Sequence, residues 1–271
     1  MSNHKTKYFT HSHHLNEDGS LSFLCAEDGW SWHGLDPYDP IVIQSINFYA
    51  SVEAGAARGT FDISKWSALT QMDWSCGNGK GHAARGVIDA LDSDESPKFS
   101  MTFFDADDVI LYQMGGTGVV FKNRDFNKWR ETSKKQVKTP LKASDFTYAQ
   151  AADSGKKSKV EVFLGAVIED KAIGLITDEN GFTPNHPYIT GSGDHVNATH
   201  LADICHQLIR QRHGSGDFVI MNGDMRFKHY VELGQIFEIV LTKSLSNCQL
   251  SFEIRQNDKI CALADIEYQV K

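Results

Sequence analysis

The feature that most constrains the fold is a repeated order of elements along the chain. The first half predicts a strand at 21–25, a turn-rich loop, and a helix at 41–57 whose apolar residues recur at spacings of three and four. The second half predicts a hairpin at 160–176, a loop, and a helix at 194–212. Strand-like runs follow the first helix at 68–75, 83–91, 98–104, 109–113 and 118–122. Further strand-like runs follow the second helix at 218–225, 237–241, 249–255 and 259–269.

Each half therefore carries a single long helix followed by several antiparallel strands. An α/β chain would need strands that alternate with helices, and the helices are too few for that arrangement. We predict an α+β fold in which two similar units each wrap a sheet around one helix. The alternative is an unrelated α+β domain whose halves match by chance.

Composition excludes several classes of protein. The chain has 271 residues and a net charge of −8, which disfavours a general nucleic-acid binder. No apolar stretch approaches the ~20 residues of a membrane helix, and the first ten residues are polar, unlike a signal peptide. The five cysteines are odd in number and dispersed, so we expect reduced thiols in the cytoplasm and no metal site.

A basic segment separates the two predicted units. We place an N-terminal unit at 1–140, a basic linker at 141–159 and a C-terminal unit at 160–271. Across 122–159 the chain holds eleven Lys or Arg against four acidic residues. This band is either a solvated linker or a surface that attracts an acidic partner.

The second predicted helix is the richest in chemically competent residues. His200, Asp203 and Gln207 are three and four residues apart and share one stripe of the helix. If a sheet encloses that stripe, burial favours the protonated form of the Asp203 carboxyl, which suits a proton donor. If the stripe faces water, Asp203 is an ordinary surface acid. His195 stands beside Asp194 and is a second-choice base or part of a helix cap.

The stretch from Asp203 to Gln207 is similar to the D-x-x-x-Q/H motif of the double-hotdog dehydratases of polyketide synthases. The wider stretch from Asp194 to Gln207 resembles the D-H-V-P-G-x-x-L-L-E-x-x-R-Q pattern of the hotdog family that makes butyrolactone autoinducers, the A-factor family. Asn197 and Ala198 replace the Pro-Gly of that pattern. The resemblance implies a tandem, or double, hotdog fold, with two long helices each wrapped by an antiparallel sheet.

In the first half, the resemblance points to His33, because hotdog dehydratases carry a histidine in the loop before the helix. The position fourteen residues later, which holds an acid in single-hotdog members, is Asn47. The modular H-x-x-x-G-x-x-x-x-P pattern is not met, since Pro37 and Val42 stand at its Gly and Pro positions. The resemblance therefore implies one site, in which His33 of the first unit faces Asp203 of the second.

On this resemblance, His33 would remove the proton alpha to a thioester carbonyl, and Asp203 would protonate the departing beta-hydroxyl. Gln207 would orient Asp203, and backbone amides near Asn197 and Ala198 would polarise the carbonyl. His195, His200 and Asn47 are second-choice site residues. The implied enzyme is a hydro-lyase of fatty acid or polyketide biosynthesis that needs no cofactor, since its substrate is carried on phosphopantetheine or coenzyme A.

Three functions remain open at this stage. A dehydratase acting on a beta-hydroxyacyl thioester is the first, with an acyl carrier protein or acyl-CoA as its partner. A hotdog thioesterase or an acyl-transferring butyrolactone-synthase-like enzyme is the second, with Asp203 activating water or aligning an acceptor hydroxyl. The third is a non-catalytic acyl-binding module. An exposed sheet edge could also pair two chains as a homodimer.

Overall fold

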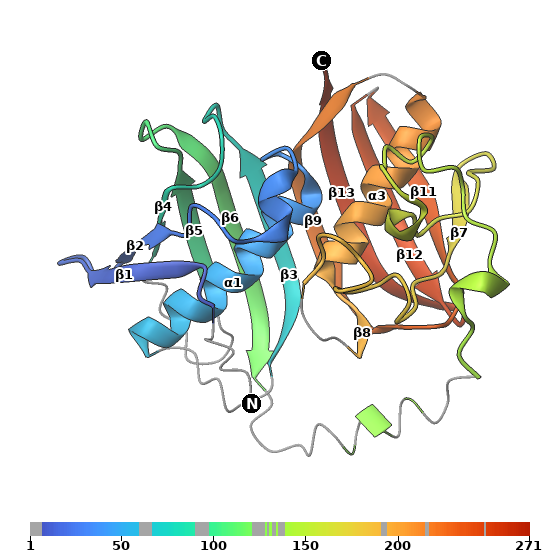
Figure 1. The fold of residues 1–271 in the computed structure, drawn as a ribbon, viewed down its shortest axis with the longest axis horizontal. Helices are drawn as coiled ribbons and strands as arrows, with labels where there is room; N and C mark the ends of the chain where they lie inside the picture. The colour runs from blue at the N-terminus through green and yellow to red at the C-terminus, as the bar shows by residue number, and fades with distance from the viewer. Residues whose placement is uncertain are drawn as a thin grey trace.

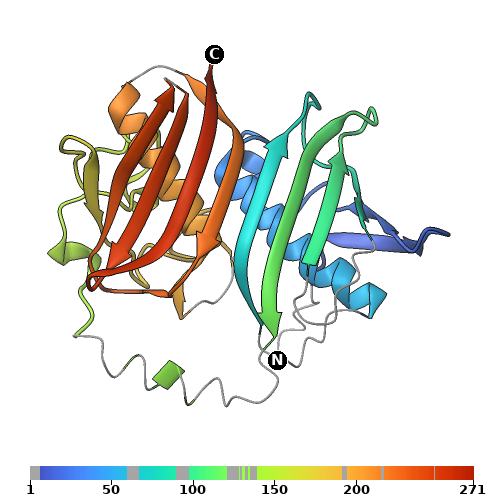
Figure 2. The same ribbon diagram turned by 180° about the vertical axis from the view of Figure 1, so that it is seen from behind.

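The computed structural model describes residues 7–59, 67–89, 98–120, 128, 130–131, 134, 139–190, 194–214, 217–246 and 248–271. Two long helices lie side by side on one face of a broad antiparallel sheet (Figure 1). The view from behind shows the opposite face of the sheet, with both helices beyond it (Figure 2). Among the described residues, no helix is long and apolar enough to cross a membrane.

The first half wraps its strands around helix α1 (Pro40–Arg58). The Asp39 side chain caps this helix by accepting a hydrogen bond from Ile41 N at 2.8 Å, and Pro40 occupies the first turn. Gly59 ends it with φ of 79°, a left-handed conformation that favours glycine. The other elements of this half are β1 (Thr10–Leu15), β2 (Leu21–Cys25), η1 (Ser31–Gly34), β3 (Ser67–Cys76), β4 (Arg85–Ile88), β5 (Lys98–Phe104) and β6 (Ile110–Val120).

The second half is built in the same way around helix α3 (Ala198–His213). Asn197 caps α3, and its side-chain oxygen accepts a hydrogen bond from His200 N at 3.2 Å. The other elements described in 139–271 are η2 (Ala143–Asp145), η3 (Lys159–Glu161), β7 (Lys171–Gly174), β8 (His195–Val196), β9 (Phe218–Phe227), β10 (Val231–Glu232), β11 (Phe237–Ser246), β12 (Gln249–Gln256) and β13 (Lys259–Val270).

Eleven of the described strands form one continuous sheet in the order β1-β2-β4-β5-β6-β3-β9-β13-β12-β11-β7, and β8 and β10 form a separate two-stranded sheet. The two halves meet where β3 pairs antiparallel with β9, a boundary that we call the seam. At the seam Met72 lies opposite Met225, and Trp74 lies opposite Gly223. A Cβ atom on Gly223 would lie 2.1 Å from Cη2 of Trp74, so the indole crosses the seam directly over this glycine.

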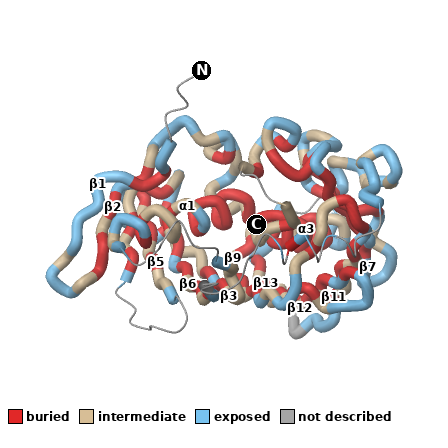
Figure 3. Tube along the Cα trace, turned by 90° about the horizontal axis from the view of Figure 1, so that it is seen from below, coloured by how far each residue is buried: buried red, intermediate tan, exposed pale blue. Residues whose placement is uncertain are grey.

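Apolar side chains fill the space between the helices and the sheet, where the buried parts of the chain concentrate (Figure 3). The first two turns of α1, from Pro40 to Asn47, are buried on every side. Three aspartates, Asp73, Asp224 and Asp265, stand in neighbouring register positions on β3, β9 and β13. Arg226 forms ion pairs with the last two, which offsets part of the repulsion between like charges on adjacent strands.

The predicted plan of two helices, each followed by antiparallel strands, is confirmed. The predicted start of the second helix at 194 is wrong, because His195 and Val196 form strand β8 and the helix begins after the Asn197 cap. The predicted hairpin at 160–176 is confirmed in part: its first residues form η3, and antiparallel bridges between Leu164 and Gly174 and between Ile168 and Lys171 join its two arms, the second of which contains β7. The unit boundaries at 140 and 159 stay a prediction.

Candidate functional site

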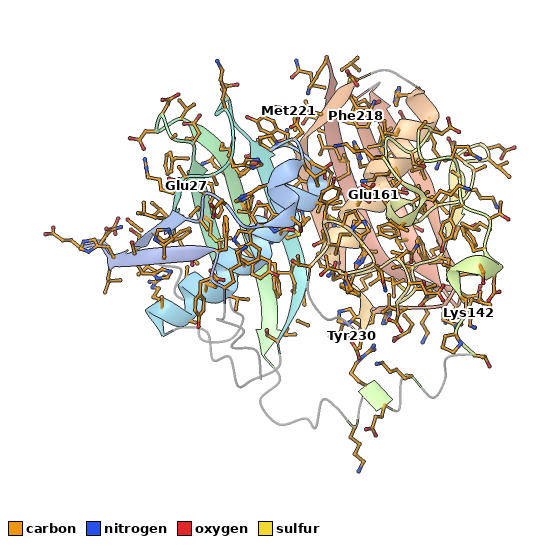
Figure 4. All side chains as sticks on the ribbon, viewed as in Figure 1. Glu27, Lys142, Glu161, Phe218, Met221 and Tyr230 are labelled. Atoms are coloured by element: carbon orange, nitrogen blue, oxygen red, sulfur yellow. The ribbon has the colours of Figure 1, made fainter. Side chains whose placement is uncertain are left out.

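Two groups of polar side chains gather at different places along α3. The first surrounds His195 and Asp194, immediately before the helix, and includes Tyr230 (Figure 4). The second surrounds Asp203 and Gln207 in the middle of the helix, near Glu161 (Figure 4). Among the described residues, no group of three or more His, Cys, Asp or Glu side chains is placed to hold a metal ion.

His195 and Asp194 form a hydrogen-bonded dyad. Nδ1 of His195 lies 2.6 Å from Oδ1 of Asp194, and the imidazole packs edge-on against Tyr230 with 4.4 Å between ring centroids. The short ladder between β8 and β10 fixes the backbone, with His195 opposite Glu232. The His195 side chain keeps 27% of its surface exposed, so one edge of the ring remains open to water.

Arg130 clamps the carboxylates around this dyad. Its Nε donates to Asp194 Oδ2 at 3.0 Å, and its two terminal nitrogens donate to the two carboxylate oxygens of Glu232 at 2.8 Å each. Its guanidinium carbon also lies 4.6 Å from the centroid of the Tyr230 ring. Burial alone would raise the pKa of Asp194, but hydrogen bonds from His195, Arg130 and Lys134 outweigh it and hold that pKa well below its usual range.

The ionised Asp194 can only accept hydrogen bonds, so Nδ1 of His195 carries the proton and Nε2 is left as a free base. Burial lowers the pKa of His195 by more than Asp194 raises it. The imidazole is therefore neutral at pH 7 and able to accept a proton. A neutral, oriented and partly exposed imidazole is the arrangement that general-base catalysis requires.

The N-terminus of α3 lies next to this dyad. The first amides of a helix, here those of Ala198 and Thr199, have no carbonyl partner within the helix, and the helix dipole adds partial positive charge there. Such amides can stabilise a developing oxyanion. The predicted position of Asn197 and Ala198 beside a reactive carbonyl is compatible with this geometry, and it stays a prediction.

His200 stabilises the start of the helix with both ring nitrogens. Nδ1 accepts from Asn197 N at 3.2 Å, and Nε2 donates to the carbonyl oxygen of Gly181 at 2.7 Å. Burial lowers the pKa of His200 to about 4, although the hydrogen bond to Gly181 opposes the shift. With both nitrogens occupied by backbone groups, this side chain has a structural role.

The second group is a buried ion pair. Nζ of Lys156 lies 2.5 Å from Oδ1 of Asp203, and these side chains are 4% and 0% exposed. Gln207 donates to Asp203 Oδ2 at 2.8 Å and to the Glu161 carbonyl at 2.9 Å, while it accepts from Phe163 N at 3.0 Å. The predicted association of Asp203 with Gln207 is present, and the four groups tie α3 to the loop at 156–163.

Asp39, the cap of α1, adds a second carboxyl to this ion pair. Burial raises the pKa of Asp39 to about 6; Lys156 opposes the shift and Asp203 adds to it. Burial alone would lower the pKa of Lys156, but Asp203 and Asp39 reverse this and raise it. Lys156 is therefore an ammonium ion in direct contact with Asp203. The sequence argument did not include this cation, and the role of Asp203 as a proton donor stays a prediction.

His33 lies in η1, within an aromatic cluster of the first half. Its ring centroid is 4.3 Å from that of Trp32 and 4.7 Å from that of His82. Burial, together with the charge of His82, lowers the pKa of His33 to about 4, despite a raising contribution from the Glu27 backbone. Although both side chains are described, no hydrogen bond or ion pair joins His33 to Asp203, and their pairing stays a prediction.

Asn47 is 4% exposed and faces the sheet, where its Nδ2 lies 3.9 Å from Sδ of Met72. Its Oδ1 has no hydrogen-bond partner among the described residues. The structure thus places Asn47 beneath α1, and not within either ionic group.

Three basic residues of the predicted surface band form ion pairs within the chain, and the side chains of two of them, Arg130 and Lys156, are buried. Arg130 is buried against Asp194 and Glu232, Lys134 pairs with Asp194 at 3.0 Å, and Lys156 pairs with Asp203. These cations were missed as site residues because their partners lie 47 to 102 residues away in sequence. Several other basic residues of the band, including Lys135, lie outside the described residues.

Solved structures with similar folds were found over nearly the whole chain. A protein of Lactobacillus plantarum assigned as an oleoyl thioesterase has a TM-score of 0.57 at 13% identity, covering 95% of this chain and 99% of its own. The 12:0-ACP thioesterase from Umbellularia californica has a TM-score of 0.57 at 10% identity, covering 93% and 97%. An acyl-ACP thioesterase from Bacteroides thetaiotaomicron has a TM-score of 0.58 at 10% identity, covering 93% and 97%.

The chain therefore has the α+β double hotdog fold that the resemblance implied. At these identities the likeness concerns the fold, and the chemistry has to be argued from this chain's own residues. No protein-family model matches the sequence, and no curated protein sequence is similar to it.

Proposed function

We propose that this protein hydrolyses acyl thioesters carried on coenzyme A or on an acyl carrier protein, with His195 as the general base. The observation that carries the proposal is the His195–Asp194 hydrogen bond, which leaves a neutral, partly exposed imidazole beside the N-terminus of α3. The double hotdog fold and the names of the similar thioesterase structures support the substrate class.

In this mechanism Nε2 of His195 takes a proton from water as the water oxygen attacks the thioester carbonyl carbon. The carbonyl π electrons move to oxygen, and the first-turn amides of α3 stabilise the resulting oxyanion. When the intermediate collapses, the C–S bond breaks, and the thiolate takes the proton back from the imidazolium. Asp194 stabilises the imidazolium, and Arg130 keeps Asp194 ionised and in place.

Dehydration, the first function predicted from the sequence, is less well supported. It requires Asp203 to donate a proton to the substrate, but Oδ1 of Asp203 lies 2.5 Å from Nζ of Lys156 and Oδ2 accepts a hydrogen bond from Gln207. The oriented carboxylate agrees better with the alternative prediction, in which Asp203 does not deliver a proton. The ion pair also ties the mid-helix region to the loop at 156–163, which gives it a structural function.

The test is to incubate the protein with saturated and 3-hydroxyacyl thioesters of coenzyme A and of a carrier protein. Released thiol is measured with a thiol-reactive dye, and mass spectrometry follows loss of water. We expect thiol release, with kcat lowered about 100-fold or more by His195→Ala. His229→Ala removes an exposed histidine close to Tyr230 and is the matched control.

The pH profile provides a second readout. Because burial lowers the pKa of His195, kcat/KM should fall only as pH drops below its ordinary value of 6.5, and should be level above it. Loss of water without thiol release, or full activity in His195→Ala, would overturn the assignment.

A further inference from the structure

A group of buried polar atoms without hydrogen-bond partners among the described residues lies near the seam. Gln44 is 2% exposed, and neither its Nε2 nor its Oε1 has a hydrogen-bond partner among the described residues. The same holds for Oδ1 of Asn47 and for Nε1 of Trp74, whose residues are 4% and 2% exposed. We call these three residues the seam polar cluster.

The two amides lie on neighbouring positions of one helix face. Gln44 and Asn47 are three residues apart on α1, so their side chains are adjacent. Asn47 reaches the sheet at Met72. Glu53 accepts hydrogen bonds from Phe9 N and Thr10 N on the β1 side. Gln44 and Glu53 are nine residues apart, which corresponds to about two and a half helical turns and places them on opposite sides of α1. Because Glu53 faces β1, Gln44 faces α3 and the seam.

Trp74 lies close to Gln44, because α1 and β3 run in opposite directions and the start of α1 lies over the end of β3. The hydroxyl of Tyr38, just before α1, donates to the carbonyls of Gly77 and Gly79, just after β3. Further along, Asn47 lies at Met72. Gln44, between these two points on the helix, therefore lies near Trp74, which points to the same face of β3 as Met72 and spans the seam over Gly223.

Buried polar groups in native proteins are nearly always hydrogen-bonded, and leaving one unpaired destabilises the fold. Four unpaired atoms on three neighbouring side chains, offering both donors and acceptors, call for a polar partner. A saturated acyl chain has no hydrogen-bonding atoms and would leave every one of them unpaired. A hydroxyl or keto oxygen on the acyl chain would pair with them.

We propose that the seam polar cluster recognises an oxygen substituent on the acyl chain, so that the preferred substrates are hydroxyacyl or oxoacyl thioesters. This inference rests on the proposed function, since it places the acyl chain of that substrate between α1 and the sheet. A site built to bond a substrate hydroxyl discriminates against the analogue that lacks it.

The experiment measures binding and hydrolysis separately. Binding of decanoyl-CoA, and of decanoyl-CoA derivatives with a hydroxyl at carbon three, five, seven or nine, is measured by calorimetry with the full-length His195→Ala chain. We expect at least one hydroxyacyl thioester to bind about tenfold more tightly than decanoyl-CoA. The wild-type chain should show the same preference in kcat/KM.

Gln44→Leu, introduced together with His195→Ala, should reduce the preference to less than about twofold. Trp74→Phe is the second variant, in case Gln44→Leu does not fold; circular dichroism checks both. The matched control is Gln71→Leu, which removes an amide from the outer face of β3, where Gln71 donates to Asp224; it should keep the preference.

A preference below about fivefold for every derivative overturns the inference. So does a preference that persists in Gln44→Leu, or in Trp74→Phe if only that variant folds. In either case the cluster binds water only. If hydroxyacyl thioesters bind preferentially but the wild-type chain releases no thiol, the inference stands and the proposed function fails. If plain and hydroxylated thioesters are hydrolysed alike, the proposed function stands and the inference fails.

Discussion

Replacing Lys156 by methionine tests the central electrostatic claim about Asp203. Methionine keeps most of the side-chain volume but removes the ammonium that lies 2.5 Å from a carboxylate with no exposed surface. Gln207 would remain as a hydrogen-bond donor to that carboxylate, but it carries no charge. Removing one partner of a buried ion pair costs about 3–5 kcal/mol, because the other charge is left buried and uncompensated. That is a large fraction of the ~5–15 kcal/mol by which typical domains are stable.

The assay is urea denaturation followed by tryptophan fluorescence, with the free energy of unfolding extrapolated to water. At about pH 7.5 we expect Lys156→Met to lower it by about 3–5 kcal/mol. At about pH 4.5 the loss should be smaller, because an unpaired carboxylate can become neutral by taking up a proton.

Two further variants make the result specific. Lys157→Met removes the neighbouring, exposed lysine and should change the free energy by less than about 0.5 kcal/mol. The double variant Lys156→Met, Asp203→Leu removes both charges and should recover most of the loss. If Lys156→Met costs less than about 1 kcal/mol, or no more than Lys157→Met, then Asp203 is not held as a buried carboxylate. The claim that a buried ion pair between Lys156 and Asp203 stabilises the fold would then be refuted.

Two other predictions concern the seam and the α1 cap. Gly223→Ala places a Cβ 2.1 Å from the Trp74 ring and should lower the free energy of unfolding by about 1–3 kcal/mol. The control Gly34→Ala places a Cβ whose nearest neighbour is 4.0 Å away and should lower it by less than about 0.5 kcal/mol. An equal effect of both substitutions would contradict the packing argument. Asp39, whose pKa burial raises to about 6, gives a contribution to stability that is lost as pH rises through that value. Asp39→Asn keeps a capping residue and should therefore gain up to about 2–3 kcal/mol relative to wild type between about pH 4 and pH 7; parallel stability profiles would contradict this.

The helices and the overall plan could be predicted because their signals are local. The three-and-four spacing of apolar residues and the Asp39-Pro40 start fixed the first helix to within a residue of Pro40–Arg58. The second helix was predicted four residues too early, because the Asn197 cap and the short strand His195–Val196 depend on pairing with Val231 and Glu232, which are distant in sequence.

The site was predictable only in part, for the same reason. Asp203 and Gln207 are four residues apart on one helix, so their hydrogen bond follows from helical geometry. The ion pair of Lys156 with Asp203 depends on a loop folding back over α3, and no local pattern marks that lysine as buried. A cation absent from the sequence argument therefore changes the surroundings expected for this acid.

The two helix N-termini differ in a way that supports the proposed placement of one hydrolytic site at the start of α3. At α1, Pro40 has no amide hydrogen, the Ile41 amide is taken by Asp39, and two carboxyl groups lie near Lys156. An oxyanion formed there would meet negative charge and few free donors. At α3, the first-turn amides face a region where Asp194 and Glu232 are neutralised by Arg130, and a neutral imidazole stands alongside. The chemistry of carbonyl activation is therefore favoured at the start of α3, while the opposite helix contributes the buried amides that an oxygenated acyl chain would meet.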